Sequence, residues 1–257
     1  FAEKVQKKIA MINATVFGGG VAEIMHSLIP LANDLGIKID WWTMEGTDEF
    51  YNVTKAFHNC LQGQEGSLTE KAKEIYLKYN KLNAEAMKDW DYDIIVIHDP
   101  QPAALIDYVN RKEGTKWVWR CHIDTSHANE EYWDFIHQYV KNYDACIFTM
   151  DEFVKEHELF PNLTFFTPSI DPLSSKNIPM DDETAKAIIS RFGIDITRPL
   201  ITQISRFDPW KDPLGVIDVY KIAKKEFPSV QLALIGSMAT DDPEGWDYLY
   251  RSLRRAG

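Results

Sequence analysis

The fold is decided by the stretch Lys8–Met44, which reads KIAMINATVFGGGVAEIMHSLIPLANDLGIKIDWWTM. The short apolar run at Lys8–Asn13 predicts a β-strand. Val21–Leu35 places apolar residues three and four positions apart, which predicts a helix, and Gly36 follows at the position favoured for a C-terminal cap. Ile37–Met44 predicts a second strand. The whole stretch therefore predicts a β-α-β unit, in which the two strands run parallel.

The alternation of short apolar runs and longer helical patterns continues to about residue 170. The continuous run Asp93–His98 is typical of a buried parallel strand. Further strands are expected at Lys116–Ile123, Ala145–Thr149 and Leu163–Thr167, and helices at Tyr51–Leu61, Thr69–Trp90, Pro102–Val109, Glu130–Asn142 and Glu152–Leu159. This repeated alternation predicts an α/β fold with a doubly wound parallel sheet.

A segment without periodicity, Pro168–Pro179, is rich in Pro, Ser and Asn and is interpreted as a linker. We expect a first domain over residues 1–170, a linker over 171–181 and the first part of a second domain over 182–257. The second part is expected to hold strands at Pro199–Ile204 and Val230–Ile235, and helices at Asp182–Phe192, Asp212–Glu226 and Trp246–Arg255. An open doubly wound sheet has about five or six strands, so this domain is expected to be incomplete.

The composition narrows the class of partner. The chain has 28 Lys and Arg against 39 Asp and Glu, a net charge of −11, which disfavours nucleic acid and anionic membranes as partners. A small anionic ligand stays compatible, because a few local cations can hold it. The cysteines Cys60, Cys121 and Cys146 are widely spaced, which indicates a reduced, cytoplasmic setting. No metal-site spacing and no nucleophile motif is present, so we expect no metal site.

A glycine-rich loop, Phe17–Val21, lies between the first predicted strand and helix. Gly18, Gly19 and Gly20 would let a phosphate or a sugar hydroxyl approach the backbone, next to the free N–H groups of a helix N-terminus. Glu23 stands where the GxGxxG motif of dinucleotide-binding proteins needs its third glycine, so this class of protein is excluded. The alternative interpretation is a tight turn without a ligand.

Two histidine–aspartate pairs each follow a predicted strand. His98 and Asp99 come directly after the Ile-rich run, and His122 and Asp124 lie in the segment Arg120–Asp124. Their side chains can form hydrogen bonds with substrate hydroxyls. In the alternative interpretation, Asp99 caps the following helix and His122 is a structural histidine.

Two cationic residues lie in the segment Ser205–Pro213, which reads SRFDPWKDP. Arg206 and Lys211 lie between a predicted strand and a predicted helix N-terminus, in a strongly acidic chain. A planar guanidinium and a compact ammonium together suit a diphosphate. The alternative is a solvated pair of charges on a loop.

The order and spacing of GGGV, HDPQPAALI, WRCHID and SRFDPWKDPLGVI resemble those of retaining glycosyltransferases of the GT-B fold, glycosyltransferase family 4. Within that family they are most similar to the trehalose synthases of archaea and bacteria. The resemblance implies two Rossmann-like domains that face each other across a cleft. The first would hold an acceptor glucose, and the second would hold a nucleoside-diphosphate glucose such as UDP-glucose or ADP-glucose.

The resemblance also implies roles for individual residues. Arg206 and Lys211 would bind the donor diphosphate, with Gly19 and Gly20 beside the donor phosphates and Gly19 also beside the sugar. His122 would contact the donor sugar near the reacting carbon, and Asp99 and His98 would contact the acceptor. The catalytic set implied in this way is Asp99, His122, Arg206 and Lys211.

The implied reaction is reversible glucosyl transfer to free glucose, which forms α,α-trehalose with retention at the anomeric carbon. The resemblance implies no tightly bound cofactor, and we expect Mg²⁺ as an activator and a homodimer. Family members carry an acidic E-x7-E segment downstream of the position of SRFDPWKDP, and the sequence to Gly257 contains none. The alternatives are a GT-B-fold nucleotide-sugar epimerase and a non-catalytic sugar-binding module.

Overall fold

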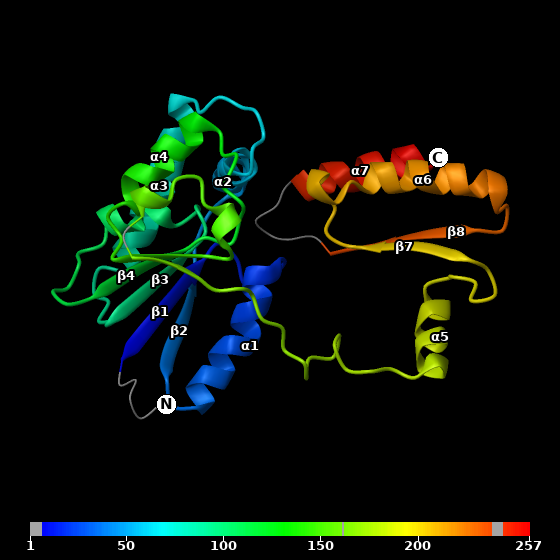
Figure 1. Ribbon diagram of the computed structural model, residues 1–257, viewed down its shortest axis with the longest axis horizontal. Coiled ribbons are helices and arrows are strands. Elements are labelled where there is room, and N and C mark those ends of the chain that lie inside the picture. The colour runs from blue at the N-terminus through cyan, green and yellow to red at the C-terminus, as the bar shows by residue number, and fades with distance from the viewer. Residues whose placement is uncertain (1–6, 161, 238–243) are drawn as a thin grey trace. The chain divides into compact units, whose positions relative to one another are not determined.

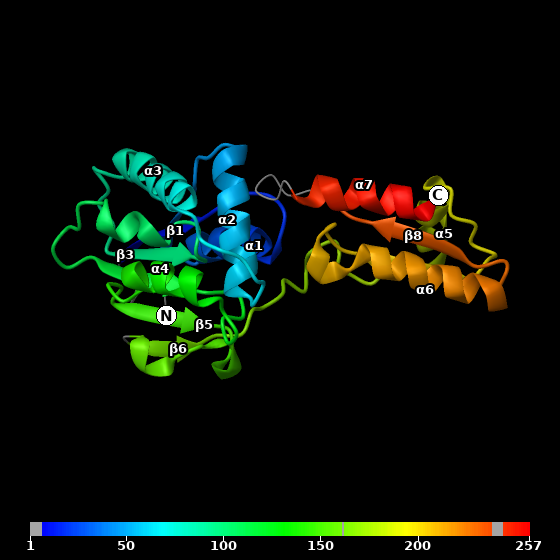
Figure 2. The same cartoon turned by 90° about the horizontal axis from the view of Figure 1, so that it is seen from above.

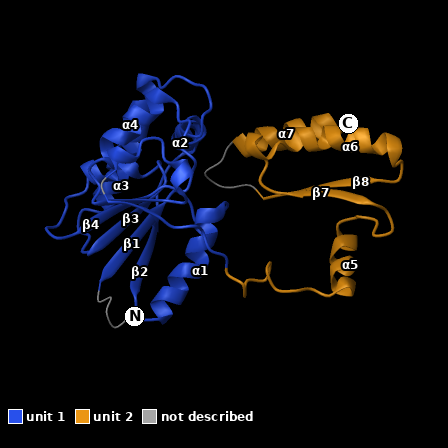
Figure 3. Ribbon diagram, in the orientation of Figure 1, with its two compact units in different colours: residues 1–170 blue, residues 171–257 orange. Residues whose placement is uncertain are grey.

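The computed structural model describes residues 7–160, 162–237 and 244–257 (Figure 1). The chain divides into two compact units, unit 1 over residues 1–170 and unit 2 over residues 171–257 (Figure 3). Within the described ranges, no helix is long and apolar enough to cross a membrane.

Unit 1 contains a six-stranded sheet in which every pair of neighbours is parallel. Its strands are β1 (Lys8–Asn13), β2 (Lys38–Thr43), β3 (Ile94–His98), β4 (Lys116–Arg120), β5 (Ala145–Phe148) and β6 (Leu163–Phe165). They lie in the order β2-β1-β3-β4-β5-β6, and Figure 2 shows the arrows of β3, β5 and β6 pointing the same way. The chain adds β2 on one side of β1 and β3 on the other, so the strand order reverses between β1 and β3. The predicted doubly wound α/β fold is confirmed.

Helices cover both faces of this sheet. On one face, Met25, Ile29 and Ala32 of α1 (Gly20–Asp34) pack with Ile39 of β2. The other face is covered by α2 (Asp48–Leu61), α3 (Glu70–Ala86) and α4 (Glu130–Val140). The largest fully buried side chains are mostly aromatic and include Trp117, Trp119, Trp133, Tyr76, Phe50, Phe57 and Phe148. This core holds the strand ends in place.

Two segments of unit 1 that were predicted to be helical form only short 3₁₀ helices and no α-helix. Pro102–Val109 forms only the 3₁₀ helix η2 (Ala103–Asp107), in which Ala103–Ile106 are all buried and the Tyr143 hydroxyl donates to Ala103 O. Because this short segment is buried, the packing around it determines its backbone conformation, and helical periodicity does not.

Glu152–Leu159 forms two 3₁₀ turns, η3 (Asp151–Phe153) and η4 (His157–Leu159). Thr125 donates to Phe153 O through both its backbone N and its Oγ1, at 2.9 and 2.7 Å. This carbonyl is therefore unavailable for a helical hydrogen bond. Val154, which is buried and extended, interrupts the helical path.

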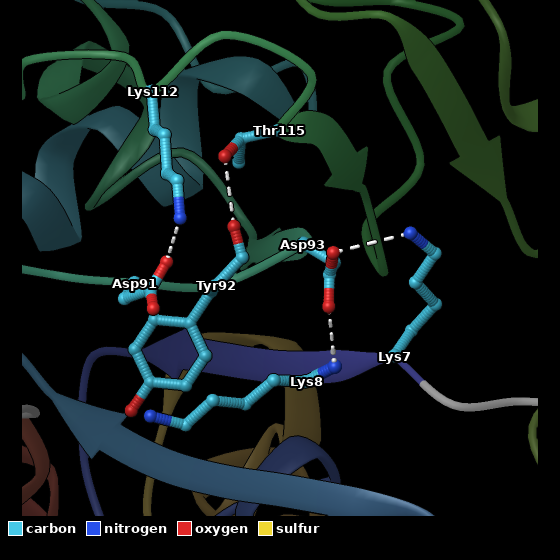
Figure 4. Close-up of polar contacts among 7 residues, drawn as sticks. All are labelled: Lys7, Lys8, Asp91, Tyr92, Asp93, Lys112 and Thr115. Atoms are coloured by element: carbon cyan, nitrogen blue, oxygen red, sulfur yellow. Dashed lines mark hydrogen bonds and ion pairs between the residues drawn. The ribbon is translucent and has the colours of Figure 1, made fainter.

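The amino edge of the sheet is tied together by Asp93, which directly precedes β3 (Figure 4). Its carboxylate accepts from the Lys8 backbone N at 2.9 Å and from Lys7 Nζ at 3.1 Å, which lowers the pKa of the carboxyl group. Close by, Thr115 Oγ1 donates to Tyr92 O at 2.8 Å. These contacts join the starts of β1, β3 and β4 at the edge opposite the carboxyl ends of the strands.

Unit 2 contains a two-stranded parallel sheet of β7 (Leu200–Ile204) and β8 (Gln231–Ile235). Its helices are α5 (Asp182–Arg191), η5 (Pro209–Lys211), α6 (Pro213–Glu226) and α7 (Glu244–Ala256). The Arg255 guanidinium forms two hydrogen bonds with the Asp218 carboxylate, at 2.9 and 2.7 Å, and so joins α7 to α6. The helices and strands predicted for this unit are confirmed, with small shifts at their ends.

Candidate active site

The sequence-predicted residues of unit 1 come together at the carboxyl edge of its sheet. β3 lies between β1 and β4, and the register pairs Ile12 with Ile97 and His98 with Arg120. The loop after β1, which carries the three glycines, therefore starts beside His98. Because the strand order reverses between β1 and β3, this is the position at which doubly wound sheets bind ligands.

His98 and His122 are in direct contact. His98 Nδ1 lies 2.9 Å from His122 Nε2, so the two rings meet edge to edge, with centroids 5.2 Å apart and planes 15° from parallel. His98 is buried, at 4% exposure, whereas His122 is half-buried. His122 is therefore the histidine that a ligand can reach, and His98 is the ring beneath it. The expectation that His98 itself contacts the acceptor is revised, because its side chain has almost no exposed surface.

Asp99 links the loop after β3 to the loop after β4, close to both histidines. It has a left-handed backbone, with φ of 64°, which is uncommon for a residue other than glycine. Its Oδ1 accepts from the His122 backbone N at 2.8 Å, and its carbonyl O accepts from Trp119 Nε1 at 2.9 Å. The cap of the following 3₁₀ helix is Pro102, so the alternative role of Asp99 as a helix cap is wrong.

The electrostatics of the pair favour neutral imidazoles. Burial lowers the pKa of His98 well below its usual value, and the charges of His122 and Arg120 lower it further. Burial also lowers the pKa of His122, opposed by Asp99 and assisted by Arg120. Arg120 is itself buried and donates from Nη1 to Phe148 O at 2.7 Å. A second positive charge beside this fixed cation is disfavoured.

Sequence reasoning missed the residues that hold the loop after β3. The Tyr76 hydroxyl, from α3, donates to Pro100 O at 2.6 Å, and Asn80 Nδ2 donates to Gln101 O at 3.1 Å. These residues lie more than 20 positions away in the chain, so no local pattern marks them. Asp124, proposed as a ligand group, instead accepts at Oδ1 from both N and Oγ of Ser126.

Two side chains, Asn13 and His26, anchor the start of the glycine-rich loop. Asn13, buried at the end of β1, accepts at Oδ1 from Trp41 Nε1 and donates from Nδ2 to Thr15 O, both at 2.7 Å. His26 of α1 lies 2.9 Å from Val16 O through Nε2, and its ring packs edge-on against Trp41. These contacts hold the start of the loop, at Thr15 and Val16, beside the end of β1.

The glycines themselves differ in what they require. Gly18 and Gly19 have φ of 79° and 90°, a conformation that other residues rarely adopt. Gly20 begins α1 with an ordinary backbone, and a Cβ on Gly19 or Gly20 would meet no atom within 4 Å. The backbone of this loop is thus open to a ligand.

In unit 2, Arg206 and Lys211 follow β7 and precede α6. The Arg206 guanidinium lies 3.4 Å from Asp208 Oδ2, and Asp208 is buried at 1% exposure. Asp208 Oδ1 in turn accepts from the Lys211 backbone N at 3.1 Å, so one carboxylate arranges both residues. The Lys211 side chain is exposed. The arrangement presents two cations next to the N-terminus of a 14-residue helix.

Two glycines in unit 2, also missed in the sequence, shape this loop. Asp212 caps α6, with Oδ1 accepting from Gly215 N at 3.0 Å, and a Cβ on Gly215 would lie 2.1 Å from Asp212 Oδ2. A Cβ on Gly236, directly after β8, would lie 2.2 Å from Ser205 O. Gly236 is therefore required by the close approach of the Ser205 backbone, whereas a Cβ on Gly215 would meet only the Asp212 side chain.

Known structures place the chain in a class of fold. It superposes on an Escherichia coli structure described as trehalose-6-phosphate bound with UDP-2-fluoro glucose, with a TM-score of 0.69, 15% identity, and coverage of 97% of this chain and 69% of that one. A Burkholderia xenovorans α,α-trehalose-phosphate synthase (UDP-forming) in complex with glucose-6-phosphate gives a TM-score of 0.69 at 12% identity, covering 96% and 70%. The chain has the GT-B type of α/β fold.

Sequence comparison then gives the family. A protein-family model described as "Trehalose synthase, N-terminal domain" matches residues 11–155, and the chain belongs to this family. It is 50% identical to the trehalose synthase of Rubrobacter xylanophilus over 97% of this chain, and 47% identical to that of Pyrococcus horikoshii over 100%. The resemblance stated from the sequence is confirmed. The chain spans 61% and 62% of the length of these two relatives.

Proposed function

We propose that the protein is a retaining glucosyltransferase, which reversibly moves glucose from a nucleoside-diphosphate glucose to free glucose and forms α,α-trehalose. The observation that carries the proposal is the 50% identity to a trehalose synthase along 97% of this chain. The polar groups at the carboxyl edge of the unit 1 sheet and the cations of unit 2 support it, because they suit sugar hydroxyls and a diphosphate respectively.

The chemistry assigns a task to each group. Cleavage of the glycosyl–phosphate bond leaves positive charge on the sugar and negative charge on the diphosphate. Arg206, Lys211 and the N-terminus of α6 would stabilise the leaving diphosphate, which is the larger electrostatic task. Asp99 and His122 would orient the sugars, and the leaving phosphate can itself accept the proton of the acceptor hydroxyl.

Substitution of the two cations tests the donor assignment. Arg206→Ala and Lys211→Ala should each weaken the binding of UDP or ADP, measured by isothermal titration, by about 1–3 kcal/mol, because each removes a charge-assisted contact. Lys225→Ala is the matched control, since it removes an exposed lysine at the opposite end of α6. Unchanged affinity in the double variant would refute the diphosphate assignment.

One transfer assay separates the candidate activities. The protein is supplied with UDP-glucose or ADP-glucose, with and without free glucose, and the products are examined for a non-reducing disaccharide. Product formation that depends on glucose supports the transferase and excludes the epimerase. Binding of glucose or trehalose without any turnover favours a sugar-binding module.

A second activity is favoured by more distant relatives. Trehalose phosphorylase of Pleurotus pulmonarius is 26% identical over 92% of this chain. The same cations could hold inorganic phosphate in place of a diphosphate. Release of glucose from trehalose that requires phosphate, and proceeds without a nucleoside diphosphate, would identify this reaction.

Three expectations stay predictions. Within the described ranges, no group of three or more His, Cys, Asp or Glu side chains could hold a metal ion, so Mg²⁺ as an activator is expected to arrive with the diphosphate. A homodimer and a cytoplasmic location are likewise predicted. Cys60, Cys121 and Cys146 are free and buried, which is compatible with a reduced compartment.

A further inference from the structure

We propose that His98 is a positioning residue, which holds His122 in the neutral tautomer protonated at Nδ1, so that His122 presents a hydrogen-bond donor to a sugar hydroxyl. His98 would act on the reacting groups only through the side chain of His122. The tautomer follows from the geometry of the two rings, and only its use toward a sugar rests on the proposed function.

The contact between the rings requires one proton. In a hydrogen bond between His98 Nδ1 and His122 Nε2, at 2.9 Å, one nitrogen donates and the other accepts. If His98 Nδ1–H donates, then His122 carries its own proton on Nδ1. If His122 Nε2–H donates, then His98 carries its proton on Nε2. The two arrangements therefore differ in which nitrogen of His122 is a donor.

The surroundings of His98 distinguish the two arrangements. His98 Nε2 is buried and has no hydrogen-bond partner within the part of the chain that the structure describes. A buried N–H without an acceptor costs more free energy than a buried acceptor nitrogen without a donor, and unpaired buried N–H groups are rare in folded proteins. An unprotonated Nε2 on His98 avoids this unpaired N–H. His98 then donates from Nδ1, and His122 is protonated at Nδ1.

Among the residues that the structure describes, no carboxylate is recorded in a hydrogen bond to the ring of His122. Asp99 Oδ1 accepts from the backbone N of His122 rather than from its ring. The charged and titratable groups that act on the pair are Asp99, which favours a charged His122, and Arg120, which disfavours charge on both rings. A carboxylate partner would make His122 more basic, whereas a neutral imidazole in a buried position does not. His122 therefore stays uncharged, which avoids a second cation beside a sugar that develops positive charge.

Nitrogen NMR of the protein without ligand tests the tautomer directly. In long-range ¹H–¹⁵N correlation spectra near pH 7, we expect Nδ1 to be protonated and Nε2 to be unprotonated in both rings. His98→Asn and His122→Asn assign the signals, because each removes one ring. A spectrum in which His122 carries its proton on Nε2, or in which either ring is doubly protonated, would overturn the proposal.

A pair of substitutions of equal shape then tests the role of the bond. Asn places an amide N–H near the position of the imidazole Nδ1, whereas Leu has a similar shape without a donor. Both variants leave a similar cavity, so their thermal midpoints should fall together. We expect His122 to keep its Nδ1–H tautomer in His98→Asn and to lose it in His98→Leu. We also expect kcat for glucosyl transfer to be about tenfold higher in the Asn variant than in the Leu variant.

The outcomes separate this proposal from the proposed function. An unchanged His122 tautomer in the Leu variant, or equal kcat in both variants, shows that His98 only fills space and refutes the positioning role. If the wild-type protein transfers no glucose, the proposed function fails, while the NMR spectra of the three proteins still decide whether His98 sets the tautomer of His122.

Discussion

His98 and His122 look alike in the sequence, since each lies at or near the end of a strand-like run and is followed within two residues by an aspartate, Asp99 or Asp124. Their surroundings differ, because the side chain of His98, the last residue of β3, is buried, whereas His122 lies two residues beyond the end of β4. The residue types at this edge were predictable from strand-end positions. Which histidine is buried was not, since burial depends on the residues that cover it.

Gly19 and Gly20 allow a prediction at single residues. Gly20→Ala should leave stability unchanged or slightly higher, because the added Cβ meets no atom within 4 Å and Gly20 begins a helix. Gly19→Ala should destabilise by about 1–2 kcal/mol, because φ of 90° is strained for any residue with a Cβ. Urea unfolding measures both effects.

Ligand binding by the Gly20→Ala variant tests the role of the loop. If a donor phosphate or sugar contacts this backbone, the methyl group should weaken UDP-glucose binding by about tenfold or more, or about 1.4 kcal/mol. Affinity equal to that of the wild type would mean that the three glycines serve only the turn.

Among the secondary structure elements, the long helices and the strands were predictable because their apolar residues repeat over several turns or fill a continuous run. The segments that became η2, η3 and η4 were not. Their backbone groups bond to distant residues such as Tyr143 and Thr125, and these tertiary bonds override the local pattern.

The loop between β7 and α6 gives a prediction for an element. Gly236→Ala should destabilise unit 2 by about 1–3 kcal/mol and weaken UDP binding, because its Cβ would lie 2.2 Å from the backbone O of Ser205 and displace the loop that carries Arg206. Gly215→Ala should cost about 1 kcal/mol, because only the movable Asp212 carboxylate must shift and the helix cap is lost.

Denaturant unfolding and titration with UDP compare the two variants. The order of the two effects is the critical result: a Gly215→Ala variant that loses more stability than Gly236→Ala would contradict this view of the loop.

Across the molecule, the two units differ in how they bury apolar groups. Unit 1 has a large, aromatic-rich core on one face of its six-stranded sheet and a smaller, mostly aliphatic cluster on the other. The buried apolar side chains described in unit 2 are those of Phe207, Pro213, Ile217 and Val230. The buried histidine pair belongs to unit 1. A fall in pH from about 6.5 to 5 is therefore expected to act mainly on the stability of that unit.

The direction of this effect follows from proton binding. The folded-state pKa values of His98 and His122 are lowered, so below about pH 6.5 the unfolded chain binds protons that the folded chain does not. Stability is then lost as pH falls, with a slope that reaches at most about 1.4 kcal/mol per pH unit for each histidine and ends where the folded-state histidine itself takes up a proton. Asp93 and Asp144, whose pKa values are lowered, stop contributing only at lower pH.

Urea unfolding of unit 1 at pH 7, 6 and 5 measures this slope. His98→Asn should reduce it, because the variant has one fewer buried neutral imidazole. His127→Asn, which removes an exposed imidazole, is the matched control. A wild-type slope that matches the His98→Asn slope would show that His98 is not held neutral by the fold.

Local patterns in the chain were sufficient to locate most strands and helices, the glycine-rich loop and the cations Arg206 and Lys211, because periodicity and turn chemistry act between near neighbours. The strand order β2-β1-β3-β4-β5-β6 and the contact between His98 and His122 depend on pairing between residues far apart in the chain. No short-range pattern encodes those contacts, since they arise when the whole sheet and its two layers of helices pack around one core.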